Sequence, residues 1–176
     1  MINLWKNMKM KLVKINRGFT LVELLVVMAI LGVLVTLVAG GFRTAQVRGR
    51  DTQRKSDLKE IANALELLYS DYNEYPAEAL GRIAACPYAP TGGTACAWGQ
   101  GEMSDMKTIY FKQVPADPSS SSFYVYRVDT SNQKFQIFAR LENDKDKDII
   151  TTAYSCGTGN CNFAITSTNT DAVESF

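Results

Sequence analysis

The chain contains 176 residues and no histidine. Without an imidazole, neither a Ser-His nor a Cys-His pair can activate a nucleophile. The sequence also has no glycine-rich phosphate-binding loop after a predicted strand. Its one acidic cluster, around residue 146, has no partner with which to complete an acid–base pair. We therefore predict that the protein is not an enzyme.

Cysteine is scarce, and the four residues all lie beyond position 85: Cys86, Cys96, Cys156 and Cys161. An even number favours disulfides if the domain faces an oxidising compartment. A zinc site is the alternative, but it would have to form without a Cys-x-x-Cys pair and without histidine. Three disulfide pairings are possible, and proximity in the sequence favours Cys86 with Cys96 and Cys156 with Cys161.

Acidic residues are missing from the first 18 positions, which carry only positive charge: Lys6, Lys9, Lys11, Lys14 and Arg17. Because the whole chain carries a net charge of +1 and this leader carries +5, the remainder carries −4. A nucleic-acid-binding surface would need clustered basic residues on the folded part, so we expect no direct nucleic-acid partner. A basic leader before an apolar segment instead fits the positive-inside rule of membrane proteins.

Charge is missing from residues 24–42, and proline from residues 19–75. About 20 apolar residues suffice to span a bilayer. Further along, apolar residues recur at spacings of three and four, as on one face of an amphipathic helix: Leu58, Ile61, Leu65, Leu68 and Tyr72. These patterns predict one helix from about Thr20 to Tyr72, with an apolar first half and an amphipathic second half.

Glu23 is the unusual residue of the apolar segment, because a charge inside a membrane helix costs about 2.5–3.5 kcal/mol at its centre and less near its end. A secretory signal peptide, cut after Ala39, would have a shorter apolar core. A plain signal anchor explains the length and the basic flank but gives Glu23 no role. Alternatively, Glu23 lies among lipid headgroups or is protonated.

Residues 18–23, Gly-Phe-Thr-Leu-Val-Glu, follow the basic leader directly. This arrangement resembles the processing signature of type IV prepilins and type II secretion pseudopilins. The resemblance implies that a membrane-embedded prepilin peptidase cuts after Gly18 and methylates the new amine of Phe19. It also implies that the Glu23 carboxylate pairs with the Phe19 amine of a neighbouring subunit during assembly.

Later segments resemble the major pseudopilins of type II secretion: residues 54–58, 72–76 and 115–118. Many members of that family carry a glycine- and aspartate-rich calcium loop after the sheet. Here the corresponding segment, residues 142–148, contains Asp144, Asp146 and Asp148, which could offer the oxygen ligands that calcium prefers. However, it lacks the glycines and has two interleaved lysines, so a solvated charged turn is the alternative. The cysteine pairs look more like those of true pilins. No cofactor other than calcium is expected.

The resemblance implies an α+β pilin-like fold, in which the long N-terminal helix packs on a small antiparallel β-sheet. We expect a leader (1–18), a membrane or filament-core half of the helix (19–42), an amphipathic half (43–75), a connecting region (76–122), and a sheet with a C-terminal tail (123–176). The connecting region would hold a short helix from Ser104 to Val114. Strands are expected at residues 123–128, 134–139 and 149–154, followed by a loose tail from Thr166.

The predicted function is that of a structural subunit of a type IV filament, most closely a type II secretion pseudopilus. A surface pilus for adhesion, motility or DNA uptake is the alternative. A membrane-anchored binding domain that never polymerises is an alternative of another class. The resemblance implies as partners further copies of the chain, the prepilin peptidase, and an inner-membrane assembly platform with a cytoplasmic ATPase. The protein would cross the inner membrane once, with an extracytoplasmic head.

Overall fold

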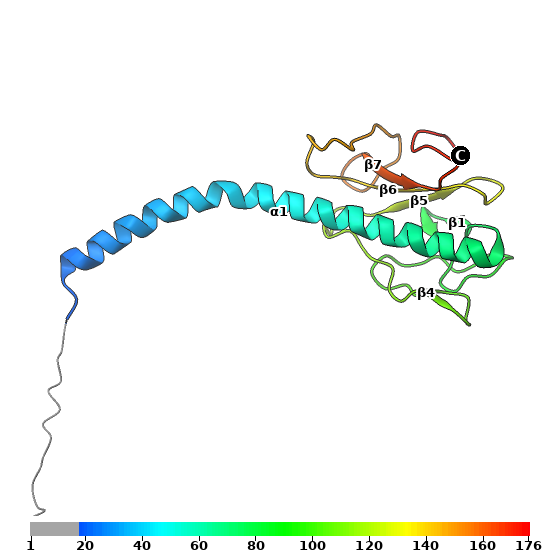
Figure 1. Ribbon diagram of the computed structural model, residues 1–176, viewed down its shortest axis with the longest axis horizontal. Coiled ribbons are helices and arrows are strands. Elements are labelled where there is room, and N and C mark those ends of the chain that lie inside the picture. Colours follow the sequence, from blue (N-terminus) through cyan, green and yellow to red (C-terminus); the bar gives the residue numbers. More distant parts are fainter. Residues whose placement is uncertain (1–17) are drawn as a thin grey trace, which may run out of the picture. The chain divides into compact units, whose positions relative to one another are not determined.

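The computed structural model describes residues 18–176 (Figure 1). Helix α1, Leu21–Tyr72, is 52 residues long and confirms the predicted helix. The residue that follows it, Asn73, has a φ of 56°; asparagine is one of the few non-glycine residues that tolerate this left-handed conformation. The chain divides into two units after Phe42, and each is described separately below.

The first unit is the apolar part of α1. All side chains from residue 21 to residue 36 are exposed, including large hydrophobic ones such as Leu21, Leu25 and Leu34. By length and composition this helix could cross a membrane. Because soluble proteins rarely expose so much contiguous apolar surface, the segment needs lipid or another protein as its environment.

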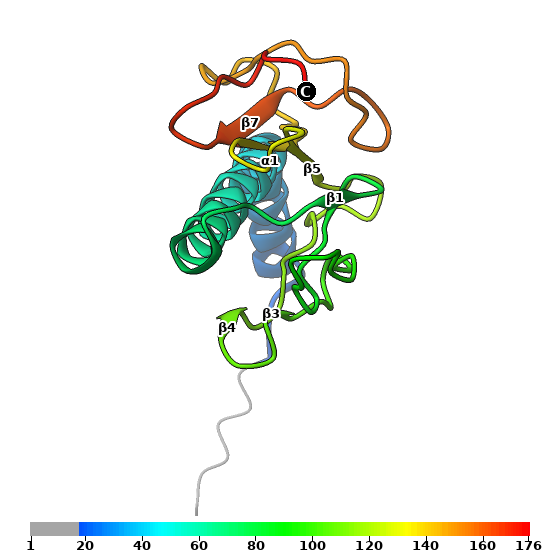
Figure 2. The same cartoon turned by 90° about the vertical axis from the view of Figure 1, so that its right-hand side faces the viewer.

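The second unit, Arg43–Phe176, is an α+β head built around the remainder of α1. Two short hairpins, β1 (Glu78–Ala79) with β2 (Arg82–Ile83) and β3 (Met103–Ser104) with β4 (Ile109–Phe111), precede an antiparallel three-stranded sheet. The sheet contains β5 (Val125–Val128), β6 (Phe135–Ala139) and β7 (Phe163–Thr166), with β6 in the middle. Within the head, this sheet lies on one side of α1, and β3 and β4 lie on the other (Figures 1 and 2). The predicted fold class is confirmed.

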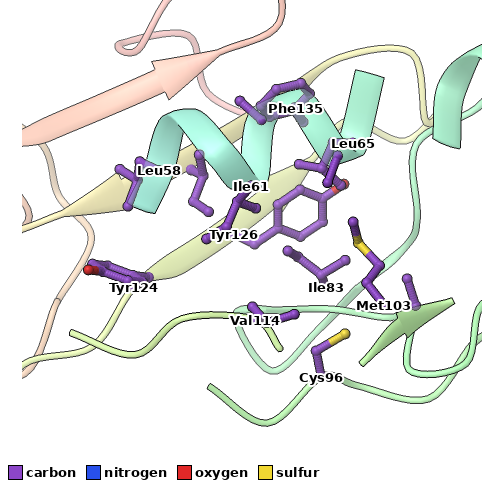
Figure 3. Close-up of a cluster of buried hydrophobic side chains, with 14 of the residues drawn as sticks. Leu58, Ile61, Leu65, Ile83, Cys96, Met103, Val114, Tyr124, Tyr126 and Phe135 are labelled. Carbon is purple, nitrogen blue, oxygen red and sulfur yellow. The ribbon is translucent and has the colours of Figure 1, made fainter. Parts of the chain in front are cut away.

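The apolar stripe of α1 forms the centre of the head core. Leu58, Leu65 and Leu68 are fully buried, and Ile61 is almost so. In Figure 3 the ring of Tyr126, from β5, lies between Ile61 and Leu65 of the helix and Ile83. Its hydroxyl donates a hydrogen bond of 2.8 Å to the carbonyl of Pro76, so the buried oxygen is satisfied. Burying one such apolar side chain contributes about 1.5–3 kcal/mol, so the stripe anchors the head to the helix.

Disulfides join Cys86 to Cys96 and Cys156 to Cys161, the two short loops that the spacing favoured. Cys96 belongs to the main core. The second bridge packs with Val125 and Phe138 in a smaller cluster. Each bridge therefore consolidates one local region of the head.

The helix predicted from Ser104 to Val114 is wrong, because the segment forms β3, a turn and β4. The Asp105 carboxylate accepts hydrogen bonds from the backbone N–H groups of Lys107 and Thr108. This side chain closes a turn instead of starting a helix. Met106 adopts a φ of 67° and is exposed, so it contributes to no apolar helix face.

The strand predicted at residues 149–154 is also wrong, and the third strand of the sheet is β7. Ile150 donates one backbone hydrogen bond to Asn162, and Cys161 donates one to Tyr154. These isolated bonds flank the Cys156–Cys161 loop and do not form a continuous ladder.

The C-terminal tail is not loose as predicted. The Gln136 side chain donates hydrogen bonds to the carbonyls of Asp171 and Glu174, and Lys134 forms an ion pair with Glu174. The tail thus covers Gln136 on β6, while the second disulfide cluster covers Phe138 and the main core covers the other three residues of that strand.

Candidate processing and assembly site

Gly18, Phe19 and Thr20 precede the first turn of α1 in non-helical conformation, and all three are exposed. Phe19 retains 81% of its surface. A Cβ atom added to Gly18 would meet no atom within 4 Å, and the residue is not in the left-handed region. Nothing in the described part of the chain therefore requires glycine at this position. The leader, residues 1–17, lies outside the described residues.

Thr20 is the N-cap of α1. Its side-chain oxygen accepts a 3.2 Å hydrogen bond from the backbone N–H of Glu23, and its carbonyl accepts one from Leu24. Thr20 and Glu23 thus occupy the Ncap and N3 positions of the pattern Thr-x-x-Glu, which often starts a helix. The capping role of Thr20 was not among the sequence-based predictions, although the Thr-x-x-Glu spacing indicates it.

Glu23 is the only charged residue between Gly18 and Phe42. It is exposed in the first turn, where the partial positive charge of the helix N-terminus favours a carboxylate. The structure thus places Gly18, Phe19 and Glu23 within one short segment at the start of the helix. The roles of these residues in cleavage, methylation and assembly stay predictions.

In the head, a buried network of charges centres on Arg54, which is fully buried. Its Nε and Nη2 atoms each donate a 2.8 Å hydrogen bond to Asp117, and its Nη1 atom donates one to Asp51. Asp51 in turn accepts backbone N–H bonds of 2.9 Å from Glu142 and Asn143. The network therefore ties α1 to the turn at residues 115–118 and to the segment after β6. This explains structurally two of the motifs seen in the sequence.

Tyrosine hydroxyls form a further set of contacts between α1 and the head. Tyr110 donates to Asp71, and the buried Tyr124 donates to Asp57, both at 2.7 Å. Burial, followed by the bond to Asp57, raises the pKa of Tyr124 well above its usual value. The same burial raises the pKa of Asp57. These contacts are hydrogen bonds from protonated phenols, so they persist at neutral pH.

The three aspartates suggested as calcium ligands are not brought together. Asp146 and Asp148 both accept hydrogen bonds from the ammonium group of Lys55, and Asp144 is exposed. Among residues 18–176, no group of three or more acidic or cysteine side chains is arranged to hold a metal ion. The structure therefore gives no calcium site of the kind that the sequence suggested.

We predict that the head loses stability in acid because of Glu142. The hydrogen bond from Arg50 lowers the pKa of Glu142 from 4.5 to about 2. Burial opposes this shift, and Arg54 adds to it. A carboxyl whose pKa is lower in the folded state stabilises the fold above the unfolded value of 4.5. That contribution is lost as the pH falls towards about 2. Fluorescence of Trp98, the only tryptophan after the leader, would report the unfolding.

A Glu142→Gln variant is the control for this prediction, and it should lose part of the acid sensitivity. An unfolding free energy that stays constant from neutral pH down to about 2 in the unmodified chain would contradict the assignment.

These features together define a pilin-like protein. The helix has an apolar first half with a processing-type sequence at its start, and a small α+β head with two disulfides surrounds its second half. A sequence model described as the prokaryotic N-terminal methylation motif matches residues 13–39. The type II secretion system core protein G of Pseudomonas aeruginosa is 32% identical over 130 residues, which cover 73% of this chain and 85% of the relative. The corresponding protein of Escherichia coli is 32% identical over 108 residues, 61% of this chain and 70% of the relative.

The chain belongs to the family of type II secretion system core protein G, the major pseudopilins. It is accordingly a structural protein, and the prediction that it is not an enzyme is confirmed. The type IV major pilin protein PilA of Myxococcus xanthus is 37% identical over 60 residues, 34% of this chain and 27% of that pilin. No solved structure matches the chain significantly.

Proposed function

We propose that this protein is the repeating subunit of a type II secretion pseudopilus, assembled from the inner membrane for protein secretion. One observation carries the proposal: the side chains at residues 21–36 of α1 are exposed on every face of the helix, and Glu23 is the only charge among them. Such a surface suits lipid before assembly and neighbouring copies of the same helix afterwards. Family membership supports the secretion role.

In this proposal the prepilin peptidase cuts the exposed peptide bond between Gly18 and Phe19 and methylates the new amine. The Glu23 carboxylate then pairs with the amine of Phe19 on a neighbouring subunit. Because an unpaired charge in an apolar environment costs far more than a paired one, this contact sets the register of the incoming subunit. The other partners are the inner-membrane assembly platform and its cytoplasmic ATPase.

The proposed location is the inner membrane, crossed once, with the head on the extracytoplasmic side. Two features support this orientation. The leader carries only basic charge, which favours the cytoplasmic side. The head contains two disulfides, which persist in oxidising compartments.

Peptide mass spectrometry of protein from the native membrane tests the proposal. We expect a mature chain that begins at N-methylated Phe19. In a Gly18→Leu variant the leader should be retained, with at least a tenfold drop in the processed fraction, because the side chain obstructs the peptidase. Since a Cβ atom at Gly18 would meet no atom of the described residues within 4 Å, the head should fold unchanged. An unmodified chain that keeps its leader, or one cut after Ala39, would exclude the filament subunit.

A surface type IV pilus is the second candidate function. The match to the Myxococcus pilin and the two disulfides favour it. Deleting the gene for this protein distinguishes the two candidate functions. Loss of protein secretion with unchanged surface filaments supports the pseudopilus, and the reverse supports the pilus. If processing occurs but neither is affected, the protein is a membrane-anchored binding domain that does not polymerise.

A further inference from the structure

A short stretch of α1, residues 50–55, holds the segment at residues 142–148, which follows β6. Arg50 donates from Nε to Glu142 at 2.8 Å, and the backbone N–H groups of Glu142 and Asn143 donate to Asp51. Lys55 binds the far end of the same segment. The segment is thus fixed at both ends by charged side chains from less than two turns of one helix.

Lys55 makes the closest approach to the aspartates. Its Nζ atom lies 2.7 Å from Asp146 Oδ1 and 2.7 Å from Asp148 Oδ2. The same Asp146 oxygen accepts the backbone N–H of Asp148 at 3.0 Å. The ammonium group also lies 5.3 Å from the centre of the Phe163 ring on β7. One positive charge is therefore shared by two carboxylates, and it joins the segment to both α1 and the sheet.

Calcium does not fit this arrangement. It requires six to eight oxygen ligands, whereas here two carboxylates converge on an ammonium group and Asp144 remains exposed. A divalent cation bound by Asp146 and Asp148 would lie within a few ångströms of the Lys55 charge, and the two would repel each other. The ion could bind only by displacing Lys55 from both carboxylates.

We propose that the ammonium group of Lys55 takes the structural place of a bound divalent cation in this segment, so that the head folds without calcium. The inference concerns the head alone and does not rest on the proposed filament function.

The first test is thermal unfolding of the full processed chain in detergent, followed by Trp98 fluorescence, in saturating calcium chloride and in excess EGTA. We expect the two midpoints to agree within about 1 °C. A calcium-binding head would gain at least about 5 °C in saturating calcium, because a ligand that binds only the folded state stabilises it. A gain of that size would overturn the proposal.

The second test compares Lys55→Met with Lys59→Met. Lys59 lies one turn further along α1, is exposed and forms no ion pair among residues 18–176, so it is a matched control for losing one positive charge. We expect Lys55→Met to lower the midpoint by about 3–6 °C and Lys59→Met to leave it nearly unchanged. Equal midpoints for the two variants would overturn the proposal.

A double-mutant cycle then identifies the partners of Lys55. One variant carries Lys55→Met, and the other carries Asp146→Asn together with Asp148→Asn. Their losses of stability should not add when all three substitutions are combined, because each variant removes the same interaction. Losses that add fully would show that Lys55 acts elsewhere, and they would overturn the assignment as well.

Discussion

Replacing Arg54 with methionine is expected to lower the free energy of unfolding of the head by about 3–5 kcal/mol. That is the usual cost of removing one partner from a buried ion pair. The Arg54 and Asp117 side chains are 1% and 0% exposed, and the substitution would leave the Asp117 carboxylate buried without its counter-ion. Methionine keeps the aliphatic stem of arginine and removes the guanidinium group with its charge and hydrogen bonds. Because whole domains are stable by only about 5–15 kcal/mol, the loss would be a large share of the stability of the head.

Urea unfolding of the processed chain, followed by Trp98 fluorescence, measures this effect. The Trp98 ring packs edge-on against Tyr124, 5.7 Å between centres, so its emission reports on the head core. Arg48→Met is the matched control, since Arg48 is an exposed arginine on the same helix. A loss within about 1 kcal/mol of this control would show that the network contributes no net stability.

A combined Arg54→Met and Asp117→Leu variant should regain part of the loss, because it removes both members of the buried pair. Asp51 would keep its backbone hydrogen bonds from Glu142 and Asn143. The recovery would distinguish the cost of an isolated buried charge from a general intolerance of substitution at Arg54.

Replacing Glu23 with glutamine is expected to reduce filament assembly at least about a hundredfold while leaving cleavage after Gly18 intact. Glutamine preserves the shape of the side chain and the backbone N–H that Thr20 binds, so α1 should start at the same residue. Only the negative charge is removed. Removing one partner of a buried ion pair costs about 3–5 kcal/mol, and 1.4 kcal/mol corresponds to a factor of ten.

The measurement is the ratio of subunits in sheared filaments to subunits in the membrane pool. Thr20→Ser, which keeps both the capping hydroxyl and the charge, is the control and should assemble normally. If the Glu23→Gln chain assembled fully, the carboxylate would have no role in docking, and the membrane-anchored binding domain would again be the better interpretation.

The helix and two strands of the sheet could be predicted because local patterns determine them. The spacing from Leu58 to Tyr72 gave the buried face of α1, and the β-forming residues gave β5 and β6. The strand β7 was missed because residues 163–166 form only one short apolar stretch, and their pairing with β6 depends on contacts distant in sequence. Ser104 was mistaken for a helix cap because the neighbouring Asp105 closes a turn instead.

The candidate site divides in the same way. Gly18, Phe19 and Glu23 are adjacent in sequence and could be found from the motif alone. The partners of Arg54 and Lys55 could not, because Asp117, Asp146 and Asp148 lie more than 60 positions away along the chain. Lys145 and Lys147 interleave with the aspartates in sequence, whereas the lysine that pairs with Asp146 and Asp148 comes from α1.

The two disulfides have a consequence for the order in which the head matures. The paired cysteines are separated by 10 and 5 positions, so neither bridge requires that α1 has already packed against the sheet. Each can close as soon as its own loop reaches an oxidising compartment, while the rest of the chain is still extended. Loops this short restrict the unfolded chain by about 2–3 kcal/mol each, and nearest-neighbour pairing gives the wrong partner little chance. Oxidation can therefore precede folding, and the bridges formed first would need no rearrangement when the head folds.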